Sequence, residues 1–408
     1  MTLGKSALNI YRGRSAPASG PVKVTWKQAT ALRLSRHNLT RRRSETALVS
    51  VLRDMGGAQS QLLMAGQMSI WARVKGMNLS RLDSALWKER TLAKAWCMRR
   101  TMFLVPSGEL ATFVRGSALR AEREIRWVLS KGVPAWKLDA VVEEVLRAMQ
   151  EPVTQSVLAE RVSVALHQKV KYVHGGGWGS RRKVPCVEVG GLTLPVNYLL
   201  HLAGARGVYC SGPSVGSETT FVRADRWIPG WRDVSRREAE KELVTWYLRS
   251  FGPSTTSDFG IWTGMTAGDA KDVWSRVEEE TVQVDVEGWS ASVLADDLEE
   301  LRSSHLDEVN VRLLPFFDSF LLGHKSHRNI VGPTDHTRVY RPAGWVSPVL
   351  LVDGRAAGVW SHTTKNGTLQ IQVTPFSGLS EKVSSLVHKE AAALGRFVGC
   401  AAVDVKGL

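Results

Sequence analysis

The chain is poor in cysteine and has no long apolar run. Its four cysteines, in 408 residues, are far apart and fit no metal-ligand spacing, so we expect reduced thiols rather than disulfides or a zinc site. No stretch of about 18 apolar residues occurs, which predicts that no helix crosses a membrane. Residues 1–20 lack the apolar core of a signal peptide and are expected to be a disordered, weakly basic lead. A cytoplasmic protein is therefore expected.

Several catalytic motifs are missing as well. No Gly-rich phosphate loop and no G-x-S-x-G turn occurs, and GGGWG at 175–179 lacks the strand–helix context of a dinucleotide-binding loop. His324 and His327 form an H-x-x-H pair without a third ligand candidate nearby. A metal-dependent nuclease would need clustered carboxylates, and the N-terminal third has few acidic residues. We therefore expect no metal and no cofactor.

Positive charge is concentrated in one part of the chain. The formal net charge is +15; residues 1–150 hold 26 Lys and Arg against 10 Asp and Glu, and the rest hold 28 against 29. The densest cluster contains five arginines: Arg33, Arg36, Arg41, Arg42 and Arg43. Such a lobe favours a polyanion, and Arg41, Arg42 and Arg43 are the predicted phosphate contacts of a DNA duplex. The alternative is a basic surface that only keeps the chain soluble.

The segment GGAQSQ at 56–61 holds two amides at a spacing that suits catalysis. In an extended segment alternate side chains point the same way, so Gln59 and Gln61 can face one spot while Ser60 points away. The two preceding glycines would end a helix. An uncharged amide pair cannot be a strong general base, but it can hold a water in line with an electrophile whose leaving group is already activated. The alternative is a solvated polar pair without a role.

Four short segments follow one another in an informative order. They are Gln59-Ser60-Gln61, Trp71-Ala72-Arg73, Trp96, and RRTMFLV at 99–105. In this order they resemble the AlkZ/YcaQ-type winged-helix DNA glycosylases, which show Gln-x-Gln or Gln-x-Asp, W-x-R, a helix ending in a tryptophan, and an R-x-T-x-x-x-V strand. Segments 247–265, 311–328 and 349–360 resemble the family's third winged helix and its C-terminal barrel.

The resemblance implies an α+β fold of about three tandem winged-helix domains and a small C-terminal β-barrel-like domain. The expected division is a lead at 1–20, a first winged helix with the catalytic motif and a helical extension at 21–134, a second with a basic hairpin at 135–235, a third at 236–310, and a β-rich domain at 311–408. Apolar periodicity and capping residues predict helices near 26–38, 45–55, 62–74, 79–90 and 382–396, and strands at 101–105 and 281–294.

An insert at 167–184, HQKVKYVHGGGWGSRRKV, reads as a basic hairpin with an aromatic tip. Its predicted phosphate contacts are five cations: Lys169, Lys171, Arg181, Arg182 and Lys183. Trp178 would wedge or stack at the DNA. The resemblance supports this function, because family members also carry a hairpin used at the DNA. The alternative is a surface loop whose Trp178 packs back on the core.

The resemblance implies base excision by hydrolysis of an N-glycosidic bond. Alkylation at nitrogen-7 gives a purine a positive charge, so it is already a good leaving group, and catalysis needs a placed water more than an acid. Gln61 is expected to touch that water, and Gln59 to orient it or the sugar. No metal, cofactor or covalent lysine is needed, and an abasic site is left. The Gln-x-Gln form resembles the AlkZ branch, which suggests bulky natural-product adducts or crosslinks, and repair as self-resistance of a producer.

A non-catalytic winged-helix DNA-binding protein or transcription regulator is the alternative from another class. Regulators usually dimerise and read inverted repeats, whereas this chain shows no coiled-coil heptads. We expect a monomer that acts on double-stranded DNA containing an alkylated purine, associated with the nucleoid.

Three positions depart from the pattern that the resemblance implies, and a fourth matches a further motif of it. The middle residue of the glutamine motif is usually aliphatic and here is Ser60, while Arg100 and Phe103 replace a glycine and a histidine of the strand motif. These departures bear on activity and substrate range. Asp318 stands in a P-x-x-D motif, where we expect a structural role or a position in a DNA-facing groove.

Overall fold

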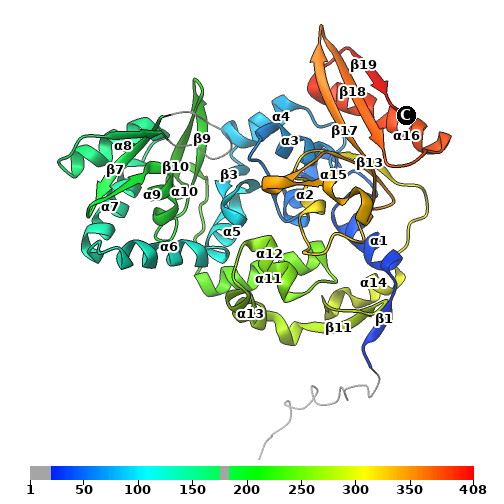
Figure 1. The fold of residues 1–408 in the computed structure, drawn as a ribbon, viewed down its shortest axis with the longest axis horizontal. Helices are drawn as coiled ribbons and strands as arrows, with labels where there is room; N and C mark the ends of the chain where they lie inside the picture. The colour runs from blue at the N-terminus through cyan, green and yellow to red at the C-terminus, as the bar shows by residue number, and fades with distance from the viewer. Residues whose placement is uncertain (1–19, 175–182) are drawn as a thin grey trace, which may run out of the picture.

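A computed structural model describes residues 20–174 and 183–408. Figure 1 shows the N-terminal third in the middle of the molecule, the green helical part beside it and the orange and red C-terminal sheet on its other side. The expected lead and the hairpin tip, which contains Trp178, Arg181 and Arg182, lie outside the described residues.

The first structural unit contains the glutamine motif. It begins after α1 (Trp26–Arg36), where Thr25 forms a reciprocal capping box with Gln28. The unit then contains a helix, a short strand, two helices and a hairpin: α2 (Leu48–Asp54), β2 (Ala58–Gln59), α3 (Leu63–Trp71), α4 (Leu79–Asp83), β3 (Leu92–Trp96) and β4 (Met102–Pro106). The sheet order is β2-β4-β3. The predicted helices and strand are confirmed, within a few residues at their ends.

One expectation about this unit was wrong. Trp96 was assigned to the end of a helix, but it is the last residue of strand β3 and pairs with Met102 of β4. Arg90 adopts a left-handed conformation with φ 57°, which a helix cannot continue through. The segment after it pairs with the strand that follows, and this pairing overrides local helix propensity.

The second unit repeats the order of elements, with a sheet inserted between two helices. After α5 (Leu110–Gly116) and α6 (Leu119–Ser130), it contains α7 (Ala135–Ala148), β5 (Val153–Thr154), α8 (Gln155–Ala165), α9 (Val196–Ala203), β9 (Tyr209–Val215) and β10 (Glu218–Arg223). The sheet order is β5-β10-β9, again first, third, second. The insert between α8 and α9 is β6 (Lys171–His174), β7 (Lys183–Val189) and β8 (Leu192–Pro195), and β6 pairs antiparallel with β7 as the hairpin prediction required.

The third unit repeats the order once more among the described residues. Its elements are α11 (Arg236–Phe251), a bridge from Ser254 to Ser292, α12 (Thr256–Thr263), α13 (Ala267–Trp274), β11 (Thr281–Val286) and β12 (Trp289–Leu294). A turn at Glu287 and Gly288 joins the last two strands, which lie in the predicted strand segment 281–294, and both residues have positive φ. Strand β1 (Val22–Val24) lies parallel to β11, so the described N-terminal end packs on this unit.

The C-terminal part is a curled five-stranded sheet covered by one long helix. Its order is β13 (Val311–Leu314), β16 (Val349–Val352), β17 (Arg355–Lys365), β18 (Thr368–Pro375) and β19 (Ala402–Lys406), with α16 (Glu381–Val398) packed on it. The two edge strands do not pair with each other, so the sheet is a half-barrel rather than a closed barrel. Its core is continuous with that of α2, α3 and α4.

A buried ion pair joins the first unit to the C-terminal part. Arg73 donates two hydrogen bonds to the Asp318 carboxylate, of 2.7 and 2.8 Å, and both side chains are fully buried. The Ser69 hydroxyl donates to the same carboxylate at 2.9 Å. The W-x-R and P-x-x-D motifs are therefore two halves of one internal contact, which gives Asp318 a structural role.

Candidate active site

The two motif glutamines lie where the short strand β2 runs into helix α3. Gln59 is buried with 6% exposure, whereas Gln61 is exposed. Between them, Ser60 is fully buried and continues the sheet by donating its N–H to the Met102 carbonyl at 2.6 Å. The extended backbone therefore places Ser60 on the core side, as its spacing predicted.

Both amide oxygens accept hydrogen bonds from the segment that leads into β4. Nη2 of Arg99 donates to Oε1 of Gln59 at 2.8 Å, and the N–H of Met102 donates to Oε1 of Gln61 at 3.4 Å. A guanidinium and a backbone N–H can only donate, so in each pair the amide atom that faces them is the oxygen. Among the described residues, neither amide nitrogen has a hydrogen-bond partner. Each glutamine thus keeps its two donors and one oxygen lone pair for other molecules.

Arg99 is held in an unusual backbone conformation. Its φ is 55°, and the following Arg100 has φ 58°, a region that non-glycine residues rarely occupy. Nη1 of Arg99 donates to the Trp262 carbonyl of α12 at 2.6 Å, and the guanidinium lies 5.6 Å from the Phe103 ring centroid. Burial lowers the pKa of Arg99 from 12.5 to about 10, so the side chain stays a cation at neutral pH.

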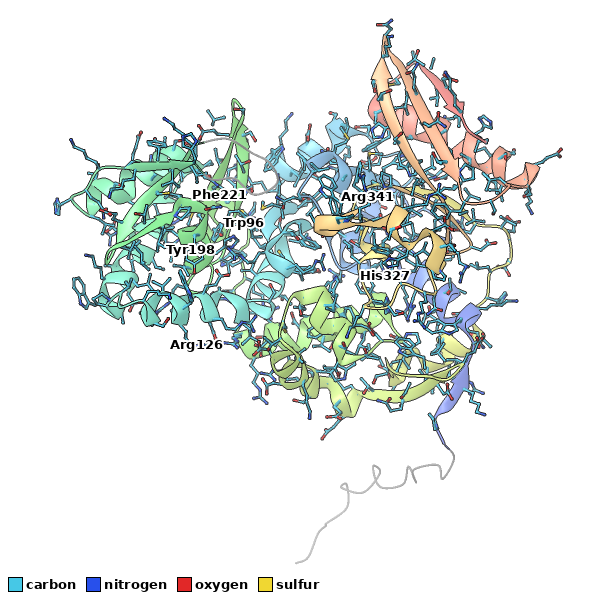
Figure 2. All side chains as sticks on the ribbon, in the orientation of Figure 1. Trp96, Arg126, Tyr198, Phe221, His327 and Arg341 are labelled. Atoms are coloured by element: carbon cyan, nitrogen blue, oxygen red, sulfur yellow. The ribbon has the colours of Figure 1, made fainter. Side chains whose placement is uncertain are left out.

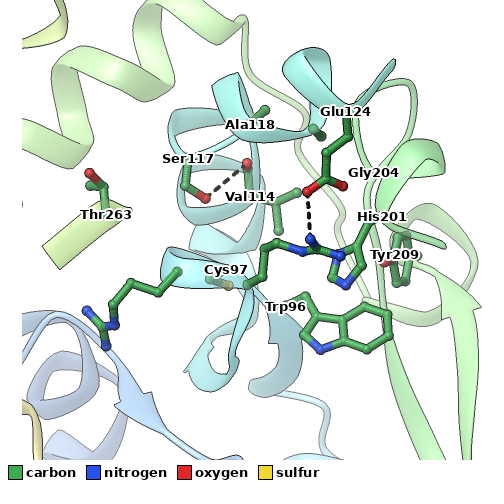
Figure 3. Close-up of a pocket in the computed structure, with 13 residues that line it drawn as sticks. Trp96, Cys97, Val114, Ser117, Ala118, Glu124, His201, Gly204, Tyr209 and Thr263 are labelled. Carbon is green, nitrogen blue, oxygen red and sulfur yellow. Dashed lines mark hydrogen bonds and ion pairs between the residues drawn. The ribbon is translucent and has the colours of Figure 1, made fainter. Parts of the chain in front are cut away.

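A small cavity lies next to this arginine, between the first and second units. Its volume is about 60 Å³, and its lining includes Arg99, Trp96, His201 and Tyr209 (Figure 3). Arg100 crosses toward α6 and forms an ion pair with Glu124 at 2.7 Å. The cavity is polar at one side and aromatic at the other, and it adjoins the residue that holds Gln59.

Trp96 joins the first two units at this point. Its ring stacks on Phe221 of β10 with centroids 5.4 Å apart and lies 4.3 Å from the ring centroid of His201. Figure 2 shows Trp96, Phe221 and Tyr198 together where the cyan and green ribbons meet. Phe103, where the resemblance led us to expect a histidine, is buried in the core with 1% exposure.

The five arginines of the densest basic cluster are in different environments. Arg33 is buried and donates to two backbone carbonyls, and Arg36 forms ion pairs with Asp297 and Glu300. Arg42 forms a bidentate ion pair with Glu390 of α16, with its guanidinium 4.8 Å from the Trp71 ring centroid. Arg41 and Arg43 are exposed, although Arg41 lies in a groove that also contains acidic side chains. Three of the five arginines, Arg33, Arg36 and Arg42, are therefore held by partners within the protein.

The described part of the basic hairpin is solvent-exposed. Lys169, Lys171 and Lys183 are all exposed, and Lys171 pairs with Glu188 at 2.7 Å. The exposed ring of Tyr172 lies on the same strand, next to Lys171. The cations at the base of the hairpin are thus available to a polyanion.

Two parts of the site, Arg99 and helix α12, have no role that could be read from the motifs. Arg99 was noted as part of the strand motif, and the contribution of α12 was not foreseen. The signal for Arg99 was its place two residues before Thr101 in that motif. No local signal indicates that Trp262 would supply its second acceptor.

The described residues contain no group of three or more His, Cys, Asp or Glu side chains that could hold a metal. His324 lies instead at 2.9 Å from the Phe251 carbonyl, and His327 stacks on Tyr340. No helix in the described ranges is long and apolar enough to span a membrane.

The fold and the paired amides define the class of protein. A chain of repeated helix–strand–helix–helix–hairpin units with two fixed glutamines and a basic N-terminal third fits a DNA glycosylase. Residues 52–397 match the profile of the AlkZ-like DNA glycosylases, and the chain belongs to that family. It is an α+β DNA glycosylase of the AlkZ type, which acts in DNA repair on damaged DNA.

Two comparisons cover nearly the whole chain. The interstrand DNA cross-link repair glycosylase of Streptomyces sahachiroi is 27% identical over 402 residues, which are 94% of this chain and 100% of the relative. The solved structure of Streptomyces sahachiroi DNA glycosylase AlkZ superposes with a TM-score of 0.75 at 25% identity, and covers 94% of this chain and 100% of that one. The similarity to the family therefore covers nearly the whole fold and is not confined to the short motifs.

Proposed function

We propose that the protein hydrolyses the N-glycosidic bond of purines alkylated at nitrogen-7, with Gln59 and Gln61 as the catalytic pair. The observation that carries this is the fixed orientation of both amides, whose oxygens are held by donors of the 99–102 segment. Gln61 is exposed and takes the contact with the attacking water. Gln59, buried behind it, orients that water or the sugar.

An uncharged pair suits this leaving group. An alkylated purine already carries a positive charge, so its departure needs no protonation, and the transition state resembles an oxocarbenium ion. Preorganised dipoles that hold a water at the anomeric carbon lower the barrier without reorganisation. The enzyme then needs no metal, cofactor or covalent intermediate and leaves an abasic site.

The substrate range we propose includes bulky adducts and interstrand crosslinks. The relative from Streptomyces sahachiroi is named for cross-link repair, and it spans the same length as this chain. The Gln-x-Gln form of the motif in this chain resembles the AlkZ branch of the family. Such lesions arise from DNA-alkylating natural products, so the activity would serve self-resistance to an antibiotic as well as general repair of alkylation damage.

The architecture we propose for DNA binding uses three winged helices. Each repeated unit has the element order and the first-third-second strand order of that motif, in the ranges 21–134, 135–235 and 236–310. The hairpin cations are the first candidates for phosphate contacts: Lys169, Lys171, Arg181, Arg182 and Lys183, with Trp178 at the tip. Arg41 and Arg43 add exposed charge, and Arg42 would have to leave Glu390 to join them. The protein would work as a monomer at the nucleoid.

The test is an excision assay on duplex DNA that carries one alkylated guanine, once methylated and once with a bulky natural-product adduct. Wild type is run beside Gln59→Ala and Gln61→Ala, and abasic sites are quantified after strand cleavage. We expect wild type to release both bases and each variant to lose roughly 100-fold or more in rate. Release of the methylated base alone would remove bulky adducts from the proposed range.

DNA binding measured in parallel separates catalysis from recognition. The two variants keep the surface cations, so their affinity for undamaged duplex should equal that of wild type. Binding without excision of any lesion would refute the proposed substrates and favour the non-catalytic DNA-binding alternative for this particular chain. Full excision by both variants would remove the glutamines from the mechanism.

A further inference from the structure

We propose that Arg99 is the positioning residue of the active site. It sets the orientation of the Gln59 amide while its own guanidinium is held by the Trp262 carbonyl of the third unit. The inference rests on the proposed function and adds to it a residue that acts through Gln59 rather than on the DNA. It joins three observations: a charge-assisted hydrogen bond to the amide, a strained backbone, and a close approach of α12.

The first observation is the choice of amide orientation. A glutamine amide can rotate by half a turn at little cost in volume, which exchanges its oxygen and nitrogen. Arg99 only donates, so its bond of 2.8 Å to Oε1 of Gln59 excludes the rotated form. The N–H groups of Gln59 are thereby directed away from Arg99.

The second observation is the conformation of Arg99 itself. A left-handed backbone is unfavourable for a residue with a Cβ, and it persists where the surrounding contacts hold the residue in place. Arg99 has a φ of 55° and uses two nitrogens on two different elements, Gln59 of β2 and Trp262 of α12. The planar guanidinium holds its donors in fixed directions toward the two acceptors, whereas a lysine ammonium is a compact charge on a flexible stem.

The third observation is the close packing of the C-terminal end of α12 against the Arg99 backbone. The helix ends at Gly264 with φ 79°, and a Cβ placed there would lie 3.1 Å from the Cα of Arg99. The Trp262 side chain is buried with 1% exposure, so the carbonyl that accepts from Arg99 belongs to a rigid part of the core. The third unit therefore contacts the Gln59 amide through Arg99.

A phosphate contact is the competing role for an arginine near bound DNA. The two roles differ in what they change: a phosphate contact supports affinity, whereas a positioning residue supports the chemical step. The neighbouring Arg100 is a matched control, because it has the same side chain and a left-handed backbone but pairs with Glu124 and not with Gln59.

The experiment is a double-mutant cycle measured by single-turnover excision. If Arg99 acts through Gln59, Arg99→Ala lowers the rate roughly 10- to 100-fold, and the Arg99→Ala/Gln59→Ala double variant is no slower than Gln59→Ala alone. DNA affinity stays unchanged. Arg99→Lys remains impaired although the charge is kept. The effects of Arg100→Ala and Gln59→Ala are expected to multiply.

Two further arms keep the inference falsifiable. Guanidinium ion added to Arg99→Ala should restore part of the rate, since the vacated volume is continuous with the 60 Å³ cavity, and should not help Gln59→Ala. The side-chain amide signals of Gln59, seen by NMR in protein labelled at glutamine nitrogen, should shift in Arg99→Lys and keep their position in Arg100→Ala.

The NMR arm separates failure of this inference from failure of the proposed function. Absence of excision by wild type would overturn the proposed substrates, and a Gln59 signal that shifts in Arg99→Lys would still support the positioning contact. The inference would be overturned if the effects of Arg99→Ala and Gln59→Ala on the excision rate multiply. It would also be overturned if the Gln59 amide signals keep their position in Arg99→Lys. Loss of affinity with an unchanged chemical rate would make Arg99 a phosphate contact.

Discussion

A single buried hydroxyl marks the main departure from the family pattern at the glutamine motif. Ser60 is fully buried, and its Oγ has no hydrogen-bond partner among the described residues. Gly66 of α3 lies so close that a Cβ there would be 2.8 Å from the Cβ of Ser60. The serine therefore fits a narrow gap between β2 and α3, at some cost in desolvation.

We predict opposite effects of two substitutions at Ser60 on stability. Ser60→Ala removes the unpaired hydroxyl and should leave the free energy of unfolding unchanged or raise it by about 1 kcal/mol. Ser60→Ile adds carbons against α3 and should lower it by roughly 1–3 kcal/mol. Urea denaturation measures both. A more stable Ser60→Ile would mean that α3 shifts readily to admit an aliphatic residue.

At the scale of elements, the buried pair Arg73–Asp318 fastens α3 to the C-terminal part. Burial alone would raise the pKa of Asp318, but the charge and hydrogen bonds of Arg73 outweigh it and hold that pKa below its ordinary value. The carboxylate is thus ionised and satisfied in the folded state. Removal of one partner leaves the other charge buried and unpaired.

We therefore predict that Asp318→Ala lowers the free energy of unfolding by about 3–5 kcal/mol. Arg302→Ala is the control, because its ion pair with Glu299 is exposed and should contribute less than about 1 kcal/mol. The double variant Arg73→Met/Asp318→Leu should recover much of the loss, since no charge stays buried. Chemical denaturation tests all three. Equal losses in Asp318→Ala and Arg302→Ala would contradict the buried-pair explanation.

A buried histidine at the end of α1 predicts sensitivity to mild acid. The His37 ring is fully buried, with its centroid 4.8 Å from that of Phe251. Burial, helped by the charge of Arg73 and Arg33 and opposed by Asp318, lowers the pKa of His37 from 6.5 to about 3. Below pH 6.5 the His37 ring binds a proton in the unfolded chain but stays neutral in the folded chain. The free energy of unfolding therefore falls as the pH decreases from 6.5 toward 3.

The test compares wild type with His37→Phe at pH 7, 6 and 5. Between pH 6 and 5 the free energy of unfolding of wild type should fall more steeply, by up to about 1.4 kcal/mol per pH unit for one proton. His324, whose pKa is also lowered by burial, remains in the variant and gives a residual slope. Identical slopes for the two proteins would show that His37 takes up its proton in the folded state.

At the scale of the whole molecule, the excess of positive charge predicts salt-dependent binding to DNA. The logarithm of the binding constant should fall linearly with the logarithm of the salt concentration, with a slope near 0.9 per phosphate contact. We predict that Lys169→Ala and Lys183→Ala each reduce this slope by about 1 and weaken binding to all duplex sequences equally. Lys406→Ala, on β19, should leave the slope unchanged. Hairpin variants that bind like wild type would remove the hairpin from the proposed interface.

Many of the helix ends and turns could be predicted from the sequence alone. Thr25, Thr154 and Thr255 each cap a helix through the side-chain oxygen that makes threonine a common N-cap. Asp353 and Gly354 both have positive φ in the turn between β16 and β17. The glutamine motif follows a helix ended by two glycines with positive φ. These features depend on neighbouring residues, so local sequence contains the information. Trp96 is the counter-example, because its strand exists only through pairing with β4.

By itself the sequence determined the family, the glutamine pair, the repeated pattern of helices and hairpins, and the basic N-terminal third. Only the tertiary structure decided which arginines are free to bind DNA. Arg42 forms an ion pair with Glu390, and Arg73 forms one with Asp318. Arg99 donates to Gln59 and to the Trp262 carbonyl, 163 residues away. The physical reason is that a side chain's type is local, whereas its partner depends on which elements pack together. The orientation of the Gln59 amide therefore depends on the tertiary fold and not on the motif alone.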